Sequence, residues 1–246
     1  MELMISLTNI SKAVTTANEE AIYERPLFII LVSVLLFVIY YLYSRNKTKK
    51  AELKDKEKQQ LINEMCNVFA KCVDSRDIYN IGHSNRVAMY SVLIAEKMGK
   101  DKSYLENIRN IGLLHDIGKI GIPDRILNKP ETLDDQEYNI MKSHASIGYN
   151  ILKDIKVSED LAIGAGYHHE HIDGSGYPRG LKGDQIPEYA QIIAVADTFD
   201  AMRSDRPYRK GMEMEEIEKE LERVAGTQLN KDAAEALLEL IREGKI

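Results

Sequence analysis

The segment "LLHDIGKIGIPD", from Leu113 to Asp124, places a histidine and an aspartate at the end of an apolar helical stretch. The apolar spacing predicts a helix over 102–117, and His115 directly follows "IGLL", so the pair is expected to face the interior. A buried histidine–aspartate pair is costly unless its members are paired or coordinated to a metal. His115 and Asp116 therefore predict a polar site at the end of a helix inside a helical protein.

The chain after residue 60 has helical patterning throughout. Apolar spacing, caps and breakers predict further helices over 61–73, from a cap at Ser84 to Met98, over 130–152 with Thr132 as the cap, from Ser158, from Pro187 to Met202, over 212–225 and over 231–242. Alternating strand patterns do not occur, although the glycine-rich stretch 172–186 has room for a loop or a small hairpin. These features predict an all-α helical bundle.

An uncharged segment near the N-terminus differs from the rest. The 19 residues from Pro26 to Ser44, "PLFIILVSVLLFVIYYLYS", match in helical length the ~30 Å hydrocarbon thickness of a bilayer. A buried core helix is the alternative, but Ser33 is the one polar residue in the middle of the segment. A cleaved signal peptide is disfavoured because residues 1–25 carry more acidic than basic side chains. We therefore expect one transmembrane helix over 26–44.

The flanks of this segment predict its orientation. Residues 44–60 hold seven Lys or Arg and residues 1–25 hold two, so the positive-inside rule places the C-terminal side in the cytoplasm. The expected organisation is a short extracytoplasmic tail (1–25), the membrane helix (26–44), a basic juxtamembrane linker (45–60) and a cytoplasmic domain (61–246). The chain is thus expected to be a single-pass protein of the cell membrane with its N-terminus outside.

Charge and cysteine content limit the partners. The net charge is −6, and because residues 1–60 hold nine basic and seven acidic side chains, the remainder carries −8. An acidic domain argues against a nucleic-acid polymer as partner, and an anionic substrate must be attracted by a local site. Cys66 and Cys72 are six residues apart, which fits no zinc-ligand spacing and offers no disulfide framework.

Seven metal-capable side chains recur along the predicted helices. They are His83, His115, Asp116, His144, His168, His169 and Asp197, and successive groups are separated by 24 to 32 residues. One helix plus one connection has this length, so each helix of a bundle is expected to bring one ligand or adjacent pair to a shared interior point. Five imidazoles and two carboxylates suffice for two first-row metal ions: iron, manganese, zinc and cobalt are compatible, and Cu(I) is not. Such ions, with Lys119 and the room left by Gly118, favour a phosphate ester as ligand.

Three motifs carry a family resemblance. "HDIGK" (115–119), "HHEHIDGSGYP" (168–178) and "ADTFDAM" (196–202) together resemble the HD-GYP family, a branch of the HD phosphohydrolases that cleaves cyclic di-GMP. The similarity extends from Asp74 to Leu240 and includes "GHSNRVA", "KSHASIGYNIL" and "AGTQLN". It implies an HD-GYP-type helical bundle over 61–246 and a metal-dependent cyclic di-GMP phosphodiesterase whose product is pGpG, with GMP after a second round.

The resemblance also implies a metal centre with two divalent ions, iron first and manganese as the alternative. Matched residue by residue, one ion is held by His83, His115 and Asp197, and the other by His144, His168 and His169. Asp116 bridges both and is a catalytic residue. Some family members bind a third metal through a Glu four residues before the position of His83. Here that position is Tyr79, a poor ligand, so two ions are expected.

The remaining roles implied by the resemblance concern the substrate. Lys119 is expected to contact the scissile phosphate and to act in catalysis. Further substrate contacts are implied for Asp200, Arg206, Arg209, Gly176, Tyr177 and Pro178. Glu170 is expected to support the ligands without binding a metal, and His171 is expected to be exposed on its loop.

Three functions stay open at the level of sequence. The first is hydrolysis of cyclic di-GMP. The second keeps the chemistry but takes another cyclic dinucleotide such as cyclic GMP-AMP, because base preference cannot be read from these motifs. The third is a non-catalytic module that binds a cyclic dinucleotide or another protein. The bilayer is an expected partner through the membrane helix, and a second copy of the chain is a further one.

Overall fold

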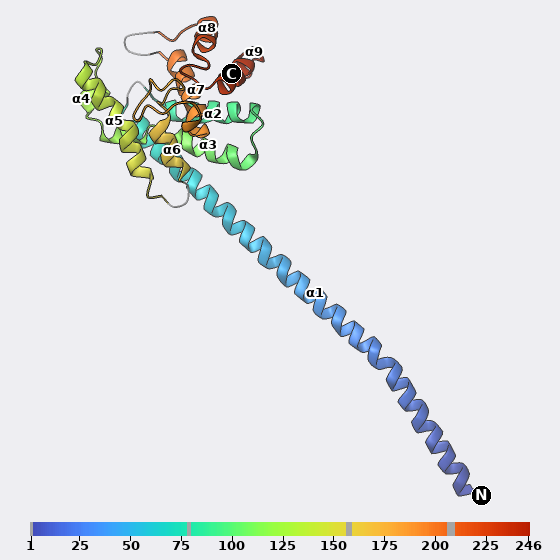
Figure 1. The fold of residues 1–246 in the computed structure, drawn as a ribbon. Helices are drawn as coiled ribbons and strands as arrows, with labels where there is room; N and C mark the ends of the chain where they lie inside the picture. Colours follow the sequence, from blue (N-terminus) through green and yellow to red (C-terminus); the bar gives the residue numbers. More distant parts are fainter. Residues whose placement is uncertain (1, 78–79, 156–158, 206–209) are drawn as a thin grey trace. The chain divides into compact units, whose positions relative to one another are not determined.

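The computed structural model describes residues 2–77, 80–155, 159–205 and 210–246, and its regular elements there are all helices (Figure 1). One isolated β-bridge, between Ala225 and Leu229, is the sole strand-like pairing in these ranges. The elements are α1 (Glu2–Asp74), α2 (His83–Lys97), α3 (Lys102–Leu114), η1 (Ile117–Gly121), α4 (Asp124–Leu127), α5 (Asp135–Leu152), α6 (Asp160–Tyr167), η2 (Gly183–Gln185), α7 (Glu188–Arg203), α8 (Met214–Val224) and α9 (Lys231–Arg242). The predicted all-α class is confirmed.

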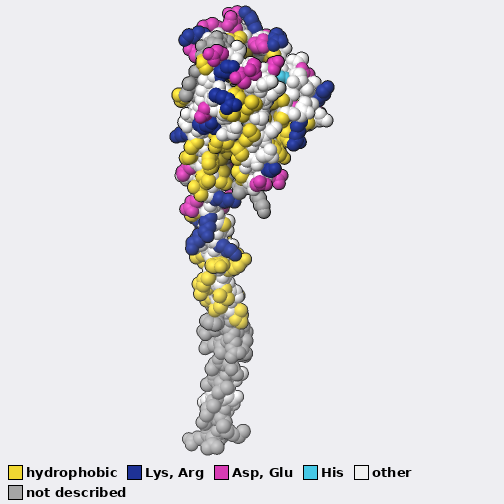
Figure 2. Space-filling model, turned by 90° about the vertical axis from the view of Figure 1, so that its left-hand side faces the viewer, with side chains coloured by type: hydrophobic (Ala, Val, Ile, Leu, Met, Phe, Trp, Pro, Cys, Tyr) yellow, Lys and Arg dark blue, Asp and Glu magenta, His cyan; other side chains and the backbone are white. Residues whose placement is uncertain are grey.

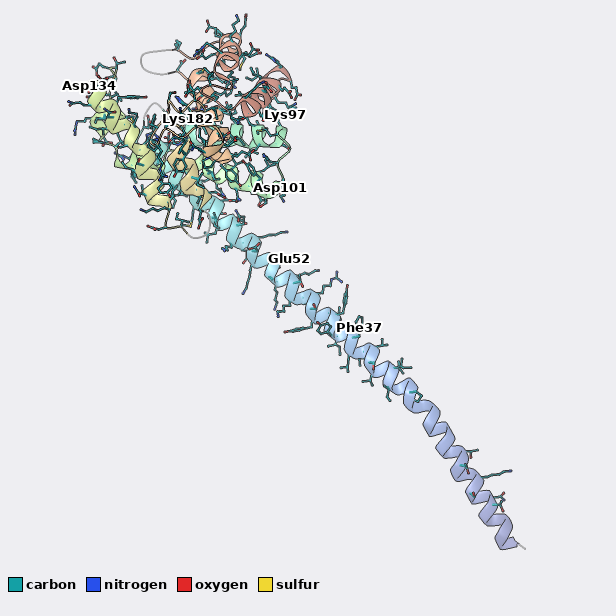
Figure 3. All side chains as sticks on the ribbon, viewed as in Figure 1. Phe37, Glu52, Lys97, Asp101, Asp134 and Lys182 are labelled. Carbon is teal, nitrogen blue, oxygen red and sulfur yellow. The ribbon has the colours of Figure 1, made fainter. Side chains whose placement is uncertain are left out.

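The chain forms two units, one up to Gln60 and one over Leu61–Ile246. The first unit is part of α1, which is longer than predicted, since the segments expected as a tail, a membrane helix and a linker form one continuous helix with Pro26 inside it. Phe37 and Glu52 project from it into open space (Figure 3). Figure 2 shows an apolar band followed by Lys and Arg side chains on this helix. It is the one described helix long and apolar enough to cross a membrane, with a mean hydropathy of 1.7 in its most apolar window.

The second unit contains a single large core. The central helix α2 packs against α3, α7 and α9, while α5 packs against α6 and η1. Fully buried side chains of α2, α3, α7 and α9 fill the interior, among them Ile94, Ile111, Ile193, Phe199 and Leu237. Because the apolar faces of α2 and α7 are covered on several sides, the polar residues at the ends of these helices are carried into the interior as well.

Two predicted helix caps are wrong, and each has a local reason. α2 starts at His83 after Gly82, whose φ of 74° lies in the left-handed region. The hydroxyl of Ser84 instead donates to the Asp74 carboxylate at 2.6 Å, so it does not cap the helix. α5 is capped by Asp134, which accepts from the backbone N–H of Glu137 at 2.9 Å. Thr132 lies before this cap.

Other differences concern short elements. The helix expected over 102–117 ends at Leu114, and the 3-10 helix η1 follows it. The four-residue α4 has no counterpart among the predicted helices. The stretch 172–186 contains the 3-10 helix η2 rather than a hairpin. The expected helix start at Ser158 lies outside the described residues.

Candidate metal centre

The structure brings the seven metal-capable residues together from five helical segments and the turns that end them. His83 begins α2, His144 lies within α5 and Asp197 within α7. The others stand at helix ends: His115 after α3, Asp116 before η1, and His168 and His169 after α6. Their nitrogen and oxygen atoms form three overlapping groups, each within 4.8 Å: His144, His168 and His169; His83, His115 and Asp197; and His115, Asp116 and His168. The first two groups match the two ligand sets that the motifs imply.

Asp116 lies between these two groups. Its Oδ2 is 3.6 Å from His83 Nε2 and 3.5 Å from His115 Nε2, while its Oδ1 is 3.5 Å from His144 Nε2. The two oxygens of one carboxylate therefore face different sets of imidazoles. A carboxylate in this position is able to join two cations held on either side of it.

Backbone carbonyls orient three of the imidazoles. The Nδ1 atoms of His115, His144 and His168 each lie 2.7 to 2.9 Å from a carbonyl oxygen three or four residues earlier. Because a carbonyl only accepts, each Nδ1 carries the proton and each Nε2 presents a lone pair to the centre. His115 Nε2 is fully buried and has no hydrogen-bond partner among the residues that the structure describes. A buried acceptor without a partner is costly, and coordination to a divalent cation would satisfy this lone pair.

The fourth orienting contact is made by Asp200. This carboxylate accepts from His83 Nδ1 at 2.7 Å and from Arg86 Nε at 2.6 Å and Nη2 at 2.9 Å. Its side chain is only 2% exposed, and it does not line the cavity described below. The expectation that Asp200 contacts the substrate is therefore not supported by its position. It lies behind His83 and directs His83 Nε2 toward Asp197, 3.2 Å away.

The protonation states of the cluster suit metal ligation. Burial lowers the pKa of His169 to about 3. Burial also lowers the pKa of His144 and His168. These imidazoles are therefore neutral at pH 7, and each can donate a lone pair to a metal ion. His83 differs: burial disfavours its charged form, but hydrogen bonds to Asp197 and Asp200 raise its pKa to about 9. A proton and a cation compete for its Nε2.

Lys119 reaches the centre from η1. Its Nζ is 2.8 Å from Asp116 Oδ2 and 3.0 Å from Asp77 Oδ2, with the side chain 13% exposed. Burial opposes its charge, but the two carboxylates raise the pKa of Lys119, so the ammonium stays protonated. Gly118 was expected to leave room for a ligand, and the structure gives a different reason. A Cβ at this position would lie 1.9 Å from the carbonyl oxygen of His144, so glycine permits η1 to pack on the α5 backbone.

A cavity of about 410 Å³ opens over these residues. Its lining includes Lys119 and five of the seven metal-capable side chains, namely His83, Asp116, His144, His169 and Asp197. It also includes residues from the segment between α4 and α5 and from the first turns of α5. These further lining residues were missed in the sequence; they include Lys129, Glu131, Tyr138 and Met141. Tyr138 and Met141 precede His144 by six and three residues, and helical spacing places all three on one face. No comparable local signal points to Lys129 or Glu131.

The loop after His169 is held in place by Glu170. Its buried carboxylate accepts from the backbone N–H of Arg179 at 2.7 Å and of Leu181 at 2.8 Å. The Tyr177 ring stacks on the His169 ring with centroids 4.7 Å apart and lines the cavity. Gly176 and Pro178 flank it without lining the cavity, and a Cβ on Gly176 would lie 2.4 Å from the His169 carbonyl oxygen. These contacts replace the hairpin that the glycine-rich sequence allowed.

Four further residues complete the set of predictions. Arg206 and Arg209, expected to hold phosphate oxygens, and Tyr79, expected not to bind a metal, lie outside the described residues. His171 is half-buried rather than exposed, and its Nδ1 lies 2.9 Å from the hydroxyl of Ser175.

Comparison with known proteins identifies the family to which the chain belongs. The family model described as the HD domain matches residues 67–232. The chain belongs to the HD domain family. Its motifs "HDIGK" and "HHEHIDGSGYP", together with its curated relatives, place it in the HD-GYP branch of this family.

Curated relatives of this HD-GYP protein are phosphodiesterases by name. A cyclic di-GMP phosphodiesterase of Thermotoga maritima is 43% identical over 198 residues, which cover 79% of this chain and 54% of the relative. The 3'3'-cGAMP-specific phosphodiesterase 3 of Vibrio cholerae is 44% identical over 144 residues, covering 58% of this chain and 31% of the relative. The HD-GYP chain thus spans about half, or less, of the length of these relatives.

Solved structures support the fold. A cyclic GMP-AMP specific phosphodiesterase of V. cholerae aligns with a TM-score of 0.59 at 18% identity, over 75% of this chain and 49% of that chain. Bd1817, an HDG"Y"P protein from Bdellovibrio bacteriovorus, aligns with a TM-score of 0.55 at 22% identity, over 65% and 51% of the two chains. At such identities the similarity concerns the helical fold alone.

Proposed function

We propose that this chain is a metal-dependent phosphodiesterase that hydrolyses a cyclic dinucleotide, with cyclic di-GMP as the substrate and pGpG as the first product. The observation that carries the proposal is the position of Asp116. Each of its oxygens faces a separate group of imidazole nitrogens, at 3.5 and 3.6 Å, beside a cavity large enough for a nucleotide. Paired cation sites of this type serve phosphoryl transfer.

The donor set suits two first-row divalent ions. It consists of imidazole nitrogens and carboxylate oxygens without thiolates, which is compatible with iron, manganese, zinc and cobalt. On the family resemblance we propose iron, with manganese as the alternative. Bound ions would supply an activated water and stabilise negative charge on phosphate oxygens. Elemental analysis of anaerobically purified protein tests this part: two ions per chain are expected, and none in the Asp116→Ala variant.

The chain's own residues would bind and orient the phosphate. The ammonium of Lys119 lines the cavity, 2.8 Å from Asp116. There it would neutralise an oxygen of a phosphate bound at the metal centre. Tyr177 and Tyr138 line the cavity with aromatic rings that suit stacking with bases. Arg206 and Arg209 are proposed to bind phosphate oxygens of the substrate.

The identity of the bases is tested directly. Full-length protein in detergent is incubated with cyclic di-GMP, 3'3'-cGAMP and cyclic di-AMP, and products are separated by chromatography. Cyclic di-GMP is expected to be hydrolysed fastest, in line with the relative from T. maritima. Faster hydrolysis of 3'3'-cGAMP would favour the second candidate, which the V. cholerae relatives support. Binding without turnover of any dinucleotide, with both metals present, would point to a non-catalytic module.

A matched pair of variants distinguishes the loss of a metal ligand from a general loss of stability. His169→Ala removes a proposed ligand, whereas His171→Ala removes a histidine two residues away whose Nδ1 contacts Ser175. We expect His169→Ala to lose metal and turnover and His171→Ala to keep both. Equal activity in the two variants would remove His169 from the centre.

We also propose that α1 anchors the enzyme in the cell membrane with the domain after Gln60 in the cytoplasm. The apolar part of α1 and the seven basic residues in 44–60 support this orientation. A phosphatase reporter that works only outside the cytoplasm, fused after Ile246, is expected to be inactive. An active fusion would reverse the orientation.

A further inference from the structure

The residue that follows α1 by two positions contacts the segment that carries Lys119. Arg76 Nη1 donates to the carbonyl oxygens of Lys119 at 3.2 Å and Ile120 at 2.7 Å. Its Nη2 donates to the carbonyl oxygen of Ile122 at 3.1 Å and to the Asp124 carboxylate at 2.6 Å. One guanidinium therefore binds three carbonyls and one carboxylate within six residues of chain.

This arrangement requires an arginine. The planar guanidinium presents five donors in a fixed fork, so one side chain can bind acceptors spread along a turn. A lysine ammonium in its place would keep the attraction to Asp124 but lacks the fork that spans three carbonyls. The backbone oxygen of Arg76 is itself bound by the Asn128 side chain at 2.9 Å, which ties Arg76 to the turn after α4.

Asp77, the neighbour of Arg76 in the chain, contacts the ammonium end of Lys119. Asp77 Oδ2 accepts from Lys119 Nζ at 3.0 Å, and from Asn80 Nδ2 at 2.7 Å. The dipeptide Arg76–Asp77 thus contacts both the backbone and the ammonium of Lys119. The lysine side chain is long and flexible, so the location of its charge depends on how firmly both ends are held.

We propose that Arg76 is a positioning residue that holds η1 so that the Lys119 ammonium stays at the metal centre. This inference rests on the proposed function, because it assigns Lys119 to the reacting phosphate. Arg76 does not line the cavity, and its guanidinium is bound to η1 and α4, so its effect on turnover must pass through Lys119. Its removal therefore lowers kcat while leaving KM and metal content unchanged.

A double-mutant cycle tests this route. Arg76→Ala is expected to lower kcat about tenfold, which is less than the loss on the order of 10²-fold expected for Lys119→Ala as a lost transition-state contact. Arg76→Ala in the Lys119→Ala background is expected to change kcat by less than about twofold, because residues that act through one another are not additive. Arg125→Ala is the matched control: this exposed arginine lies in the neighbouring α4, and wild-type kcat is expected.

The measurement uses the full chain in detergent with cyclic di-GMP, alongside elemental analysis. Additive losses in the double variant, or loss of metal in Arg76→Ala, would overturn the proposal, since both indicate a structural role outside Lys119. Where Arg76→Ala does not fold, Arg76→Lys takes its place with the same expected pattern. Should this second variant also fail to fold, or give wild-type kcat, the positioning role is refuted.

A second readout does not depend on activity. Hydrogen exchange of the peptide covering 117–124 is expected to be at least tenfold faster in Arg76→Ala than in the wild type, and unchanged in Arg125→Ala. If the wild-type protein hydrolyses no cyclic dinucleotide, the proposed function fails, and exchange still decides whether Arg76 holds η1. Unchanged exchange in Arg76→Ala would overturn the inference in either case.

Discussion

Replacing Gly118 by alanine is expected to separate η1 from α5. The new Cβ would lie 1.9 Å from the carbonyl oxygen of His144 and 2.5 Å from the backbone nitrogen of Gly148. Both contacts are to backbone, so no side-chain rotation relieves them. Overpacking commonly costs 1–3 kcal/mol, and a clash with helix backbone on two sides is expected at the upper end, about 3 kcal/mol.

This loss is large enough to measure by calorimetry. For a domain of 150–250 residues, each kcal/mol lowers Tm by about 2–4 °C, so Gly118→Ala in the 61–246 domain is expected to melt about 6–12 °C lower. Since η1 begins after Asp116 and α5 carries His144, the same shift moves two ligands apart. Bound manganese is therefore expected to fall below two ions per chain.

Gly121 provides a matched control in the same 3-10 helix. A Cβ there would lie 3.0 Å from the end of the Ile147 side chain, which is able to move. Gly121→Ala is expected to cost less than about 1 kcal/mol, with Tm within about 4 °C of the wild type and both metals retained. Equal melting temperatures for the two variants would refute the argument that η1 is held against the α5 backbone.

Further expectations concern the orienting carboxylate, the substrate contacts, proton release and the membrane helix. Asp200→Asn weakens the contact that orients His83, and metal affinity is expected to fall 10- to 100-fold by competition with a chelator; unchanged affinity would contradict this role. Lys119→Ala is expected mainly to lower kcat and Arg206→Ala mainly to raise KM in steady-state kinetics, and a variant with normal values would exclude its residue from the site. Because the pKa of His83 is raised to about 9 in the metal-free protein, this imidazole is protonated below that pH. Manganese binding at pH 7.5 is expected to release about one proton per chain from it, measured by calorimetry in buffers of different ionisation enthalpy, and affinity is expected to rise with pH toward 9. Deleting residues 1–60 is expected to leave a soluble active domain, because every proposed ligand lies in the second unit; a folded, metal-bound but inactive fragment would show that α1 does more than anchor.

Sequence alone determined the helical class and the set of metal-capable residues. Helical periodicity is a local property, so α7 and α9 were predicted to within a few residues from spacing and caps. The ligands were identifiable because HD and HH pairs recur at the ends of predicted helices within recognisable motifs. The cap of α5 was mispredicted because Thr132 and Asp134 both stand near the helix start. That of α2 was mispredicted because the Ser84 hydroxyl donates to Asp74, ten residues earlier in α1, and no side chain caps the helix.

Only the tertiary structure decided what surrounds these ligands. Asp200 binds His83 across 117 residues of chain, and Arg76 binds η1 across more than 40, so neither contact leaves a pattern within one helix. The same holds for Gly118, whose role depends on the α5 backbone, and for Glu131, which meets the site only where the turn before α5 covers the cavity. Spacing along a helix predicts which face a residue occupies, whereas its partner on another segment is set by how the helices pack.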